Sequence, residues 1–156
     1  MITCGTFDMP WGRISVEISE YGLQRVHLDA PVGVRLTGIW AEAFAAYVEG
    51  RDIFATLPVD VRQLSPFTQQ VLMACRAIPV GHVMSYAQLA MMVGRPRAAR
   101  AVGSALAHNP VPIVIPCHRV VGTGGRLTGF LGGLALKRRL LIYEGCRFIG
   151  DSVDTR

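Results

Sequence analysis

The segment Ser85–Ala107, SYAQLAMMVGRPRAARAVGSALA, decides the fold expected for the second half of the chain. Ser85 and Gln88 have the S-x-x-Q spacing of a capping box, which predicts that a short helix begins here. Gly94-Arg95-Pro96 breaks that helix, and a second helix is expected from about Arg97 to Ala107. Two short helices joined by a tight turn that contains glycine are typical of a helix-turn-helix.

The second of these helices has an apolar side and a smooth outer side. Val102, Ala105 and Leu106 can pack inward, whereas Arg100 stands alone on an outer face of alanine and glycine. A helix that reads bases in the major groove usually carries Asn, Gln, Arg or Lys at several exposed positions. The pattern therefore favours DNA binding without sequence preference. It fits equally well an ordinary helical hairpin whose arginines are solvated.

The composition describes a folded and moderately basic chain. Of its 156 residues, 51% are hydrophobic and 17% are charged, which excludes a disordered protein and allows one ordinary domain or two small ones. The net charge of +5 favours a polyanion, nucleic acid first, as a partner. No signal peptide, membrane-length apolar run or C-x-x-C pair is apparent. We therefore expect a reduced, cytoplasmic protein that does not enter membranes.

Residues 1–60 are expected to form a small α/β domain, because alternating and helical apolar patterns follow one another there. Strands are expected at Thr6–Met9, Ile14–Ser19, Arg25–Leu28 and Leu57–Val61. One helix is expected over Ile39–Val48, with an apolar face formed by Ile39, Trp40, Ala43, Phe44, Tyr47 and Val48. Residues 61–66 are expected to be a linker to a mostly helical domain of residues 67–156. The helix pattern that opens this second domain starts at Pro66, a residue suited to the first position of a helix.

A thiol, an imidazole and a guanidinium stand side by side in Ile115-Pro116-Cys117-His118-Arg119. The thiolate is the nucleophilic form of cysteine, and positive surroundings from His118 and Arg119 are expected to lower the pKa of Cys117. The preceding Val111–Ile115 is expected to be an apolar strand. Neighbouring residues of a strand point to opposite faces, so Cys117 and His118 need a turn or a bridging water to communicate.

Glu144 is the candidate for a group that orients the imidazole. The basic helix GLALKRRLLIYEG ends at Gly145, which puts Glu144 in the last turn, where the helix dipole disfavours an anion by about 0.3–1 kcal/mol. This break of a local rule suggests a partner such as His118, and a surface ion pair with Arg147 is an equally good interpretation. A metal site is not expected, because neighbouring Cys117 and His118 lack the usual ligand spacing.

Together these segments resemble the O6-alkylguanine-DNA alkyltransferases. The stretches that carry the resemblance, in the family's order, are FTQQVL (67–72), SYAQLA (85–90), RAARAVG (97–103), NPVPIVIPCHRVVG (109–122) and GGLALKRRLLIYEG (132–145). They cover most of residues 67–145, whereas the first half fits only in its β-rich layout with one helix. The resemblance implies an α+β fold, with a ribonuclease H-like layout of the N-terminal antiparallel sheet and a winged helix-turn-helix in the C-terminal domain.

The resemblance implies direct repair of DNA by a methylated-DNA–protein-cysteine methyltransferase. Cys117 would accept the alkyl group of O6-alkylguanine, or of O4-alkylthymine, in a suicide reaction that leaves a stable thioether. His118 would draw off the thiol proton through a water, and Glu144 would orient His118. Tyr86 would donate a proton toward the leaving base, and Asn109 would brace the turn before the active-site segment.

The resemblance also implies contacts with double-stranded DNA. Arg100 would enter from the minor-groove side and fill the gap left by the flipped nucleotide. Residues expected to line the DNA are Ala98, Ala99, Gly103 and Thr123, and those expected at the base pocket are Val120, Phe130 and Leu131. The protein is expected to act as a monomer, without sequence preference and without a cofactor. Phe130 departs from the tyrosine common in the family, and of the zinc ligands found in some members only Cys4 has a counterpart, so no zinc is expected.

Three other functions stay open at this point. A non-catalytic protein that binds alkylated DNA would carry another residue, often Trp, at the place of Cys117. A helix-turn-helix regulator would prefer one DNA sequence and would usually dimerise. A Cys–His hydrolase would need an oxyanion site that the sequence does not reveal. The sequence also leaves open the size of alkyl group accepted, the effect of Phe130 and the fate of the alkylated protein.

Overall fold

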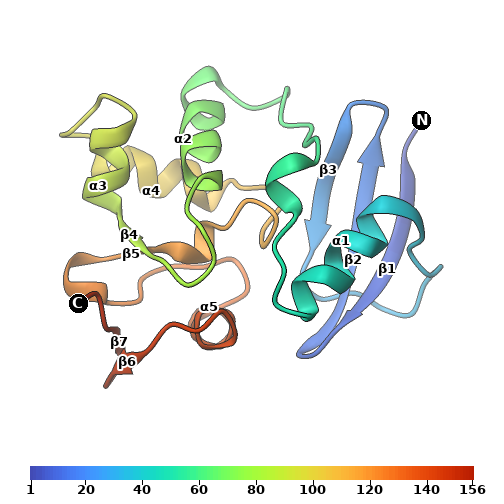
Figure 1. Cartoon of the computed structure of the whole chain (residues 1–156). Coiled ribbons are helices and arrows are strands. Elements are labelled where there is room, and N and C mark those ends of the chain that lie inside the picture. The colour runs from blue at the N-terminus through green and yellow to red at the C-terminus, as the bar shows by residue number, and fades with distance from the viewer. The chain divides into compact units, whose positions relative to one another are not determined.

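The computed structural model describes all 156 residues, and the chain divides into two compact units (Figure 1). Unit 1 comprises Met1–Arg62 and Pro110–Val114, and unit 2 comprises Gln63–Asn109 and Ile115–Arg156. Pro110–Val114 was expected with the second half of the chain, but it packs with unit 1, where the Val26 amide donates to the Pro110 carbonyl at 2.8 Å. No helix combines the length and the apolar character that crossing a membrane requires.

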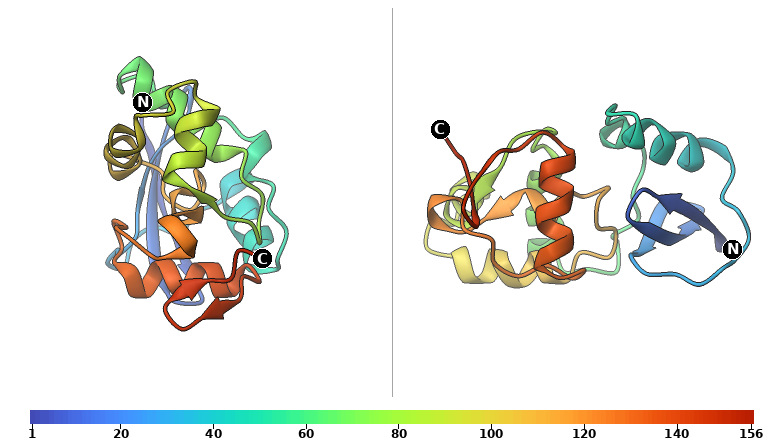
Figure 2. Two further views of the ribbon diagram at one scale, coloured as in Figure 1. Left: turned by 90° about the vertical axis from the view of Figure 1, so that its left-hand side faces the viewer. Right: turned by 90° about the horizontal axis from the view of Figure 1, so that it is seen from below.

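Unit 1 is an antiparallel sheet in the order β1-β2-β3 with α1 lying across one face (Figures 1 and 2). Its elements are β1 (Thr3–Met9), β2 (Gly12–Ser19), β3 (Gly22–His27), α1 (Gly38–Val48) and the 3-10 turn η1 (Phe54–Thr56). The expected alternation is confirmed, since Ile14 and Val16 of β2 are buried. Phe44 of α1 joins helix to sheet, with its ring centroid 5.9 Å from that of Phe7 and 5.0 Å from that of Phe54.

Two expectations for unit 1 are wrong. Leu57–Val61 forms no strand, and only an isolated bridge between Leu23 and Val59 is made there. Ile39, which was placed on the buried face of the helix, is 51% exposed. The other residues expected on that face, Trp40, Ala43, Phe44 and Tyr47, are buried.

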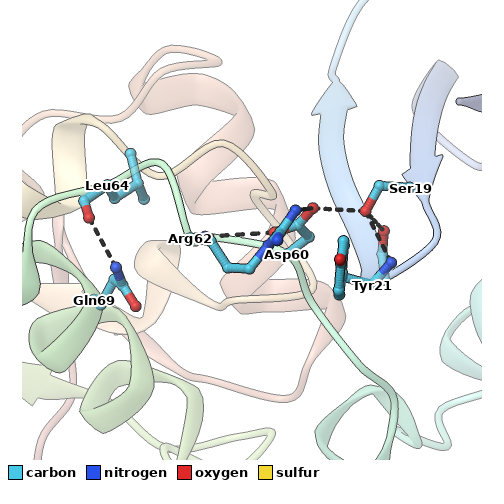
Figure 3. Close-up of polar contacts among 7 residues, drawn as sticks. Ser19, Tyr21, Asp60, Arg62, Leu64 and Gln69 are labelled. Atoms are coloured by element: carbon cyan, nitrogen blue, oxygen red, sulfur yellow. Dashed lines mark hydrogen bonds and ion pairs between the residues drawn. The ribbon is translucent and has the colours of Figure 1, made fainter. Parts of the chain in front are cut away.

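Asp60 fastens the end of unit 1 to the sheet (Figure 3). Its buried carboxylate accepts hydrogen bonds from Ser19 Oγ at 2.6 Å and from Arg62 Nε at 2.8 Å. The hydrogen bonds from Arg62 and Ser19 lower the pKa of Asp60 to about 2, against the effect of burial. The Arg62 guanidinium also lies 3.5 Å above the centre of the Tyr21 ring. These contacts hold Asp60 and Arg62, at the end of the first segment of unit 1, against the sheet.

Unit 2 is mostly helical, and its helices α2, α3 and α4 pack on one another. Its elements are α2 (Pro66–Arg76), β4 (Met84–Ser85), α3 (Tyr86–Met92), α4 (Ala99–Ala107), η2 (Cys117–Arg119), β5 (Val120–Val121), η3 (Thr123–Gly125), α5 (Leu134–Tyr143), β6 (Phe148–Ile149) and β7 (Ser152–Val153). β4 pairs in parallel with β5, and β6 pairs with β7 in a C-terminal hairpin that the sequence pattern did not predict. The ribonuclease H-like layout and the wing stay predictions.

The expected starts of α2 and α3 are confirmed, whereas α4 begins at Ala99, two residues after the expected Arg97. Ser65 caps α2 and Pro66 takes its first turn, where the Gln69 side-chain amide also donates to the Leu64 carbonyl at 2.8 Å (Figure 3). The capping box of α3 is complete: Ser85 Oγ accepts from the Gln88 amide at 3.0 Å, and Gln88 Oε1 accepts from the Ser85 amide at 2.8 Å. The capping box fixes Tyr86 as the first residue of α3, directly after β4.

Candidate active site

Cys117, His118 and Arg119 lie in the 3-10 turn η2, which packs against α2 and α5. The strand expected just before them is absent, because Val111–Ile115 forms turns in which Ile113 has the positive φ of 75°. Cys117 is 8% exposed and lines a cavity of about 260 Å³. The other residues that line this cavity are Tyr86, Gly103, Leu106, Ala107, Gly129, Phe130 and Leu131.

A buried carboxylate joins the imidazole and the guanidinium of this turn. Glu144 Oε2 lies 2.7 Å from His118 Nε2, and the two Glu144 oxygens accept from Arg119 Nε at 2.8 Å and from Arg119 Nη2 at 3.1 Å. A third bond, of 2.7 Å, runs from Arg119 Nη1 to the Ile78 carbonyl. Of the two interpretations of Glu144, the structure therefore supports the pairing with His118, and Arg119 is an additional partner that sequence reasoning missed.

The charges of this cluster fix the state of the imidazole. Burial raises the pKa of Glu144, but His118 and Arg119 outweigh it and hold that pKa at about 2, so the carboxylate is ionised. Burial lowers the pKa of His118, which keeps the ring neutral at pH 7. An ionised carboxylate only accepts hydrogen bonds, so Nε2 carries the ring hydrogen and Nδ1 has a free lone pair. Nδ1 is buried and makes no hydrogen bond to the protein.

The expected lowering of the Cys117 pKa is wrong. Burial raises the pKa of this thiol, and a hydrogen bond from Asn109 and the charge of Lys137 offset only part of that effect. Arg119 does not provide the expected positive surroundings because Glu144 and the Ile78 carbonyl occupy its guanidinium. The resting side chain is therefore a thiol, and any reaction through sulfur needs a base. Asn109 also donates from Nδ2 to the Ile115 carbonyl at 2.9 Å.

A buried lysine, Lys137, binds the backbone beside the cavity, where Gly129 forms part of the wall. Lys137 Nζ donates to the carbonyls of Val120 and Thr128, both at 2.7 Å, and of Gly129 at 3.2 Å. Burial lowers the pKa of Lys137 to about 8. Sequence reasoning missed this residue because it stands in a basic run, although its spacing from the buried Leu140 and Leu141 is that of one helix face.

Residues 66–146 match the family model described as 6-O-methylguanine DNA methyltransferase, DNA binding domain. This chain belongs to the methylated-DNA–protein-cysteine methyltransferase family. It is 46% identical to the member from Mycolicibacterium paratuberculosis over 92% of this chain and 93% of that protein, and 43% identical to the member from Salmonella typhimurium over 85% and 74%.

A solved structure agrees with the match in sequence. The Mycobacterium tuberculosis O6-methylguanine methyltransferase in complex with DNA superposes with a TM-score of 0.74 at 34% identity, over 90% of this chain and 92% of that one. The mixed α+β architecture with a small antiparallel sheet is therefore the architecture of the family.

The residues expected at the DNA of an alkyltransferase fall in different places. On α4, Arg100 is exposed, while Ala99 and Gly103 are half-buried, and Ala98 caps the helix start. Thr123 is exposed but lines a separate, larger cavity of about 810 Å³, which also includes His82, Arg147 and Arg156.

The residues expected at the base pocket also differ in exposure. Leu131 is 59% exposed at the 260 Å³ cavity, and Phe130 meets the His118 ring edge-on at 6.3 Å between centroids. Val120 is fully buried and absent from the cavity wall, with its carbonyl bound by Lys137. No group of three or more His, Cys, Asp or Glu side chains is placed to hold a metal ion.

Proposed function

We propose that this protein repairs alkylated DNA by transferring the alkyl group from O6 of guanine to Sγ of Cys117, once per molecule. One observation carries the proposal: Cys117 lines a cavity beside His118, whose far nitrogen lies 2.7 Å from an ionised, buried carboxylate. Family membership supports it, and relatives bear the name methylated-DNA–protein-cysteine methyltransferase. O4-alkylthymine, which presents a similar alkyl oxygen, is a second substrate.

The transfer follows from the states of these groups. His118 Nδ1 takes the thiol proton through a bridging water, and Glu144 stabilises the resulting imidazolium. The thiolate attacks the alkyl carbon, the sulfur–carbon bond forms, and the carbon–oxygen bond breaks with its electron pair left on the base. Tyr86 gives a proton to a ring nitrogen of the leaving guanine. The thioether has no easy hydrolytic exit, so the protein is consumed.

The damaged base must leave the duplex to reach Cys117, a residue that is only 8% exposed. Arg100 is placed on the exposed face of α4, from which it enters on the minor-groove side and fills the gap in the stack. Ala98, Ala99 and Gly103 let this helix approach the DNA closely, and their side chains offer no hydrogen bonds to base edges. The protein therefore acts on double-stranded DNA without sequence preference, and one copy suffices.

Mass spectrometry of the digested protein tests the proposal. After incubation with a duplex that contains O6-methylguanine, the peptide with Cys117 should gain one methyl group, and the yield should not exceed one methyl per protein. Cys117→Ser should bind the duplex without gaining mass, and Cys146→Ser should react as the native chain does. Methyl on Cys75 or Cys146, or DNA binding with no methyl transfer, would reject the assignment, and the second result would favour a non-catalytic binder of alkylated DNA.

A further inference from the structure

The hydroxyl of Tyr86, a residue of the cavity wall, is held by a single residue, Thr128. Thr128 Oγ1 donates to Tyr86 Oη at 3.1 Å, and Tyr86 Oη donates to the Thr128 carbonyl at 3.3 Å. The two contacts close a small ring in which the threonine hydroxyl is the donor to the phenol oxygen. Both side chains are half-buried, so solvent competes only partly for these bonds.

The backbone of Thr128 is held by the ammonium group of Lys137. Lys137 Nζ donates to the Thr128 carbonyl at 2.7 Å and to the Gly129 carbonyl at 3.2 Å, and it lies 5.9 Å from the centre of the Tyr86 ring. An ammonium group has three hydrogens, which match the three carbonyls that Lys137 reaches. The loop that carries Thr128 is thereby tied to α5, and the place of its hydroxyl does not depend on Tyr86 alone.

The proposed reaction puts a specific demand on this contact. To give its proton to the leaving guanine, the Tyr86 hydroxyl turns from the Thr128 carbonyl to the base, and the phenolate that results has no proton left to donate. The Thr128 hydroxyl can still donate to Oη, and a hydrogen bond to a charged oxygen is roughly twice as strong as one to a neutral oxygen. The contact therefore strengthens as the proton leaves, which lowers the barrier more than it stabilises the bound substrate.

We propose that Thr128 is a positioning residue that holds the Tyr86 oxygen in place at the cavity wall and stabilises the phenolate formed on proton transfer. This inference rests on the proposed function. The charges balance: the thiol and the phenol each lose a proton, His118 and the guanine each gain one, and the alkyl group moves from oxygen to sulfur. Imidazolium and phenolate remain, and water restores both when the product leaves.

Thr128→Val tests the inference because it keeps the branched shape of the side chain and removes the donor. The rate constant for methyl transfer at saturating O6-methylguanine duplex should fall about 10- to 100-fold, the range of one hydrogen bond to a charged group. The duplex concentration for half-saturation should change less than twofold. Thr128→Ser should recover most of the rate, and the exposed Thr155→Val should match the native chain. Thermal unfolding should confirm that each variant is folded.

A double variant separates positioning of Tyr86 from a general effect on the pocket. Tyr86→Phe removes the hydroxyl, so Thr128→Val added to Tyr86→Phe should cause less than a twofold further loss. An undiminished loss in that background, a native rate in Thr128→Val, or no recovery in Thr128→Ser would each overturn the inference. Failure of the native chain to methylate Cys117 would instead reject the proposed function.

Discussion

Glu144 Oε2 and His118 Nε2 lie 2.7 Å apart, and their side chains are 1% and 0% exposed. The pair joins the end of α5 to the turn η2, two segments that are distant in the sequence. Because the carboxylate is almost fully shielded from bulk water, it holds the imidazole in one tautomer, with the lone pair on Nδ1. This relationship leaves Nδ1 of His118 able to accept a proton while Nε2 donates to Glu144, and replacing one oxygen of Glu144 by nitrogen would disturb it.

Glu144→Gln should slow methyl transfer by about 10²- to 10⁴-fold, the usual contribution of a general base. A glutamine amide can donate to Nε2, which moves the ring hydrogen to Nδ1 and removes the acceptor for the thiol proton. Rapid-quench measurement of methylated protein gives the rate constant. The exposed Glu42→Gln on α1 serves as the control and should react at the native rate. A native rate in Glu144→Gln would show that another group takes the thiol proton.

Arg119→Met should lower the free energy of unfolding by about 3–5 kcal/mol, because it leaves the buried Glu144 carboxylate without its bidentate partner. Urea denaturation at pH 7 measures the change. Arg139→Met, an exposed arginine on the same helix as the Glu144 cap, should change the value by less than about 0.5 kcal/mol. Equal small effects of the two substitutions would mean that His118 alone satisfies the carboxylate.

The free energy of unfolding should depend on pH through Glu144 and His118. Glu144 has a folded pKa of about 2 against an ordinary value of 4.5, so its contribution is complete above pH 4.5 and is lost as the pH falls toward 2. The lowered pKa of His118 acts in the same direction, with stability lost as the pH falls below 6.5. The native chain should lose about 2 kcal/mol through Glu144 between pH 7 and pH 3.

Comparison with Glu144→Gln separates the loss of unfolding free energy due to Glu144 from the losses due to other carboxylates such as Asp60. The variant starts less stable at pH 7, and its unfolding free energy should fall less steeply between pH 5 and pH 3. Parallel curves for the two proteins would show that the folded pKa of Glu144 is close to its ordinary value.

Local patterns predicted much of this fold. The S-x-x-Q spacing predicted the start of α3, and period-two alternation located β2 and β3, because both signals depend only on residues close in sequence. The prediction of a strand before Cys117 was wrong because an apolar run indicates burial but not the type of backbone structure. Pro110–Val114 is apolar because it is buried with unit 1, and burial of a turn and of a strand produce the same run of apolar residues.

The site was predictable as a set of residues but not as an electrostatic state. Cys117, His118 and Glu144 could be named from the motif, since Glu144 violated the dipole rule at its helix end. The partners of Arg119 and the burial of Cys117 depend on contacts between segments far apart in the chain. For that reason the pKa of Cys117 was expected on the wrong side of its ordinary value.

Arg100→Ala should separate extrusion of the base from the chemistry of transfer. If Arg100 fills the gap in the stack, its loss should slow repair of O6-methylguanine in a duplex by at least about 10-fold, since unstacking costs a few kcal/mol. Reaction with free O6-benzylguanine, which needs no extrusion, should slow less than twofold. Arg97→Ala, which removes another exposed arginine just before α4, should affect duplex repair more weakly. Equal losses on duplex and free base would place Arg100 in the chemical step or in the stability of α4 instead.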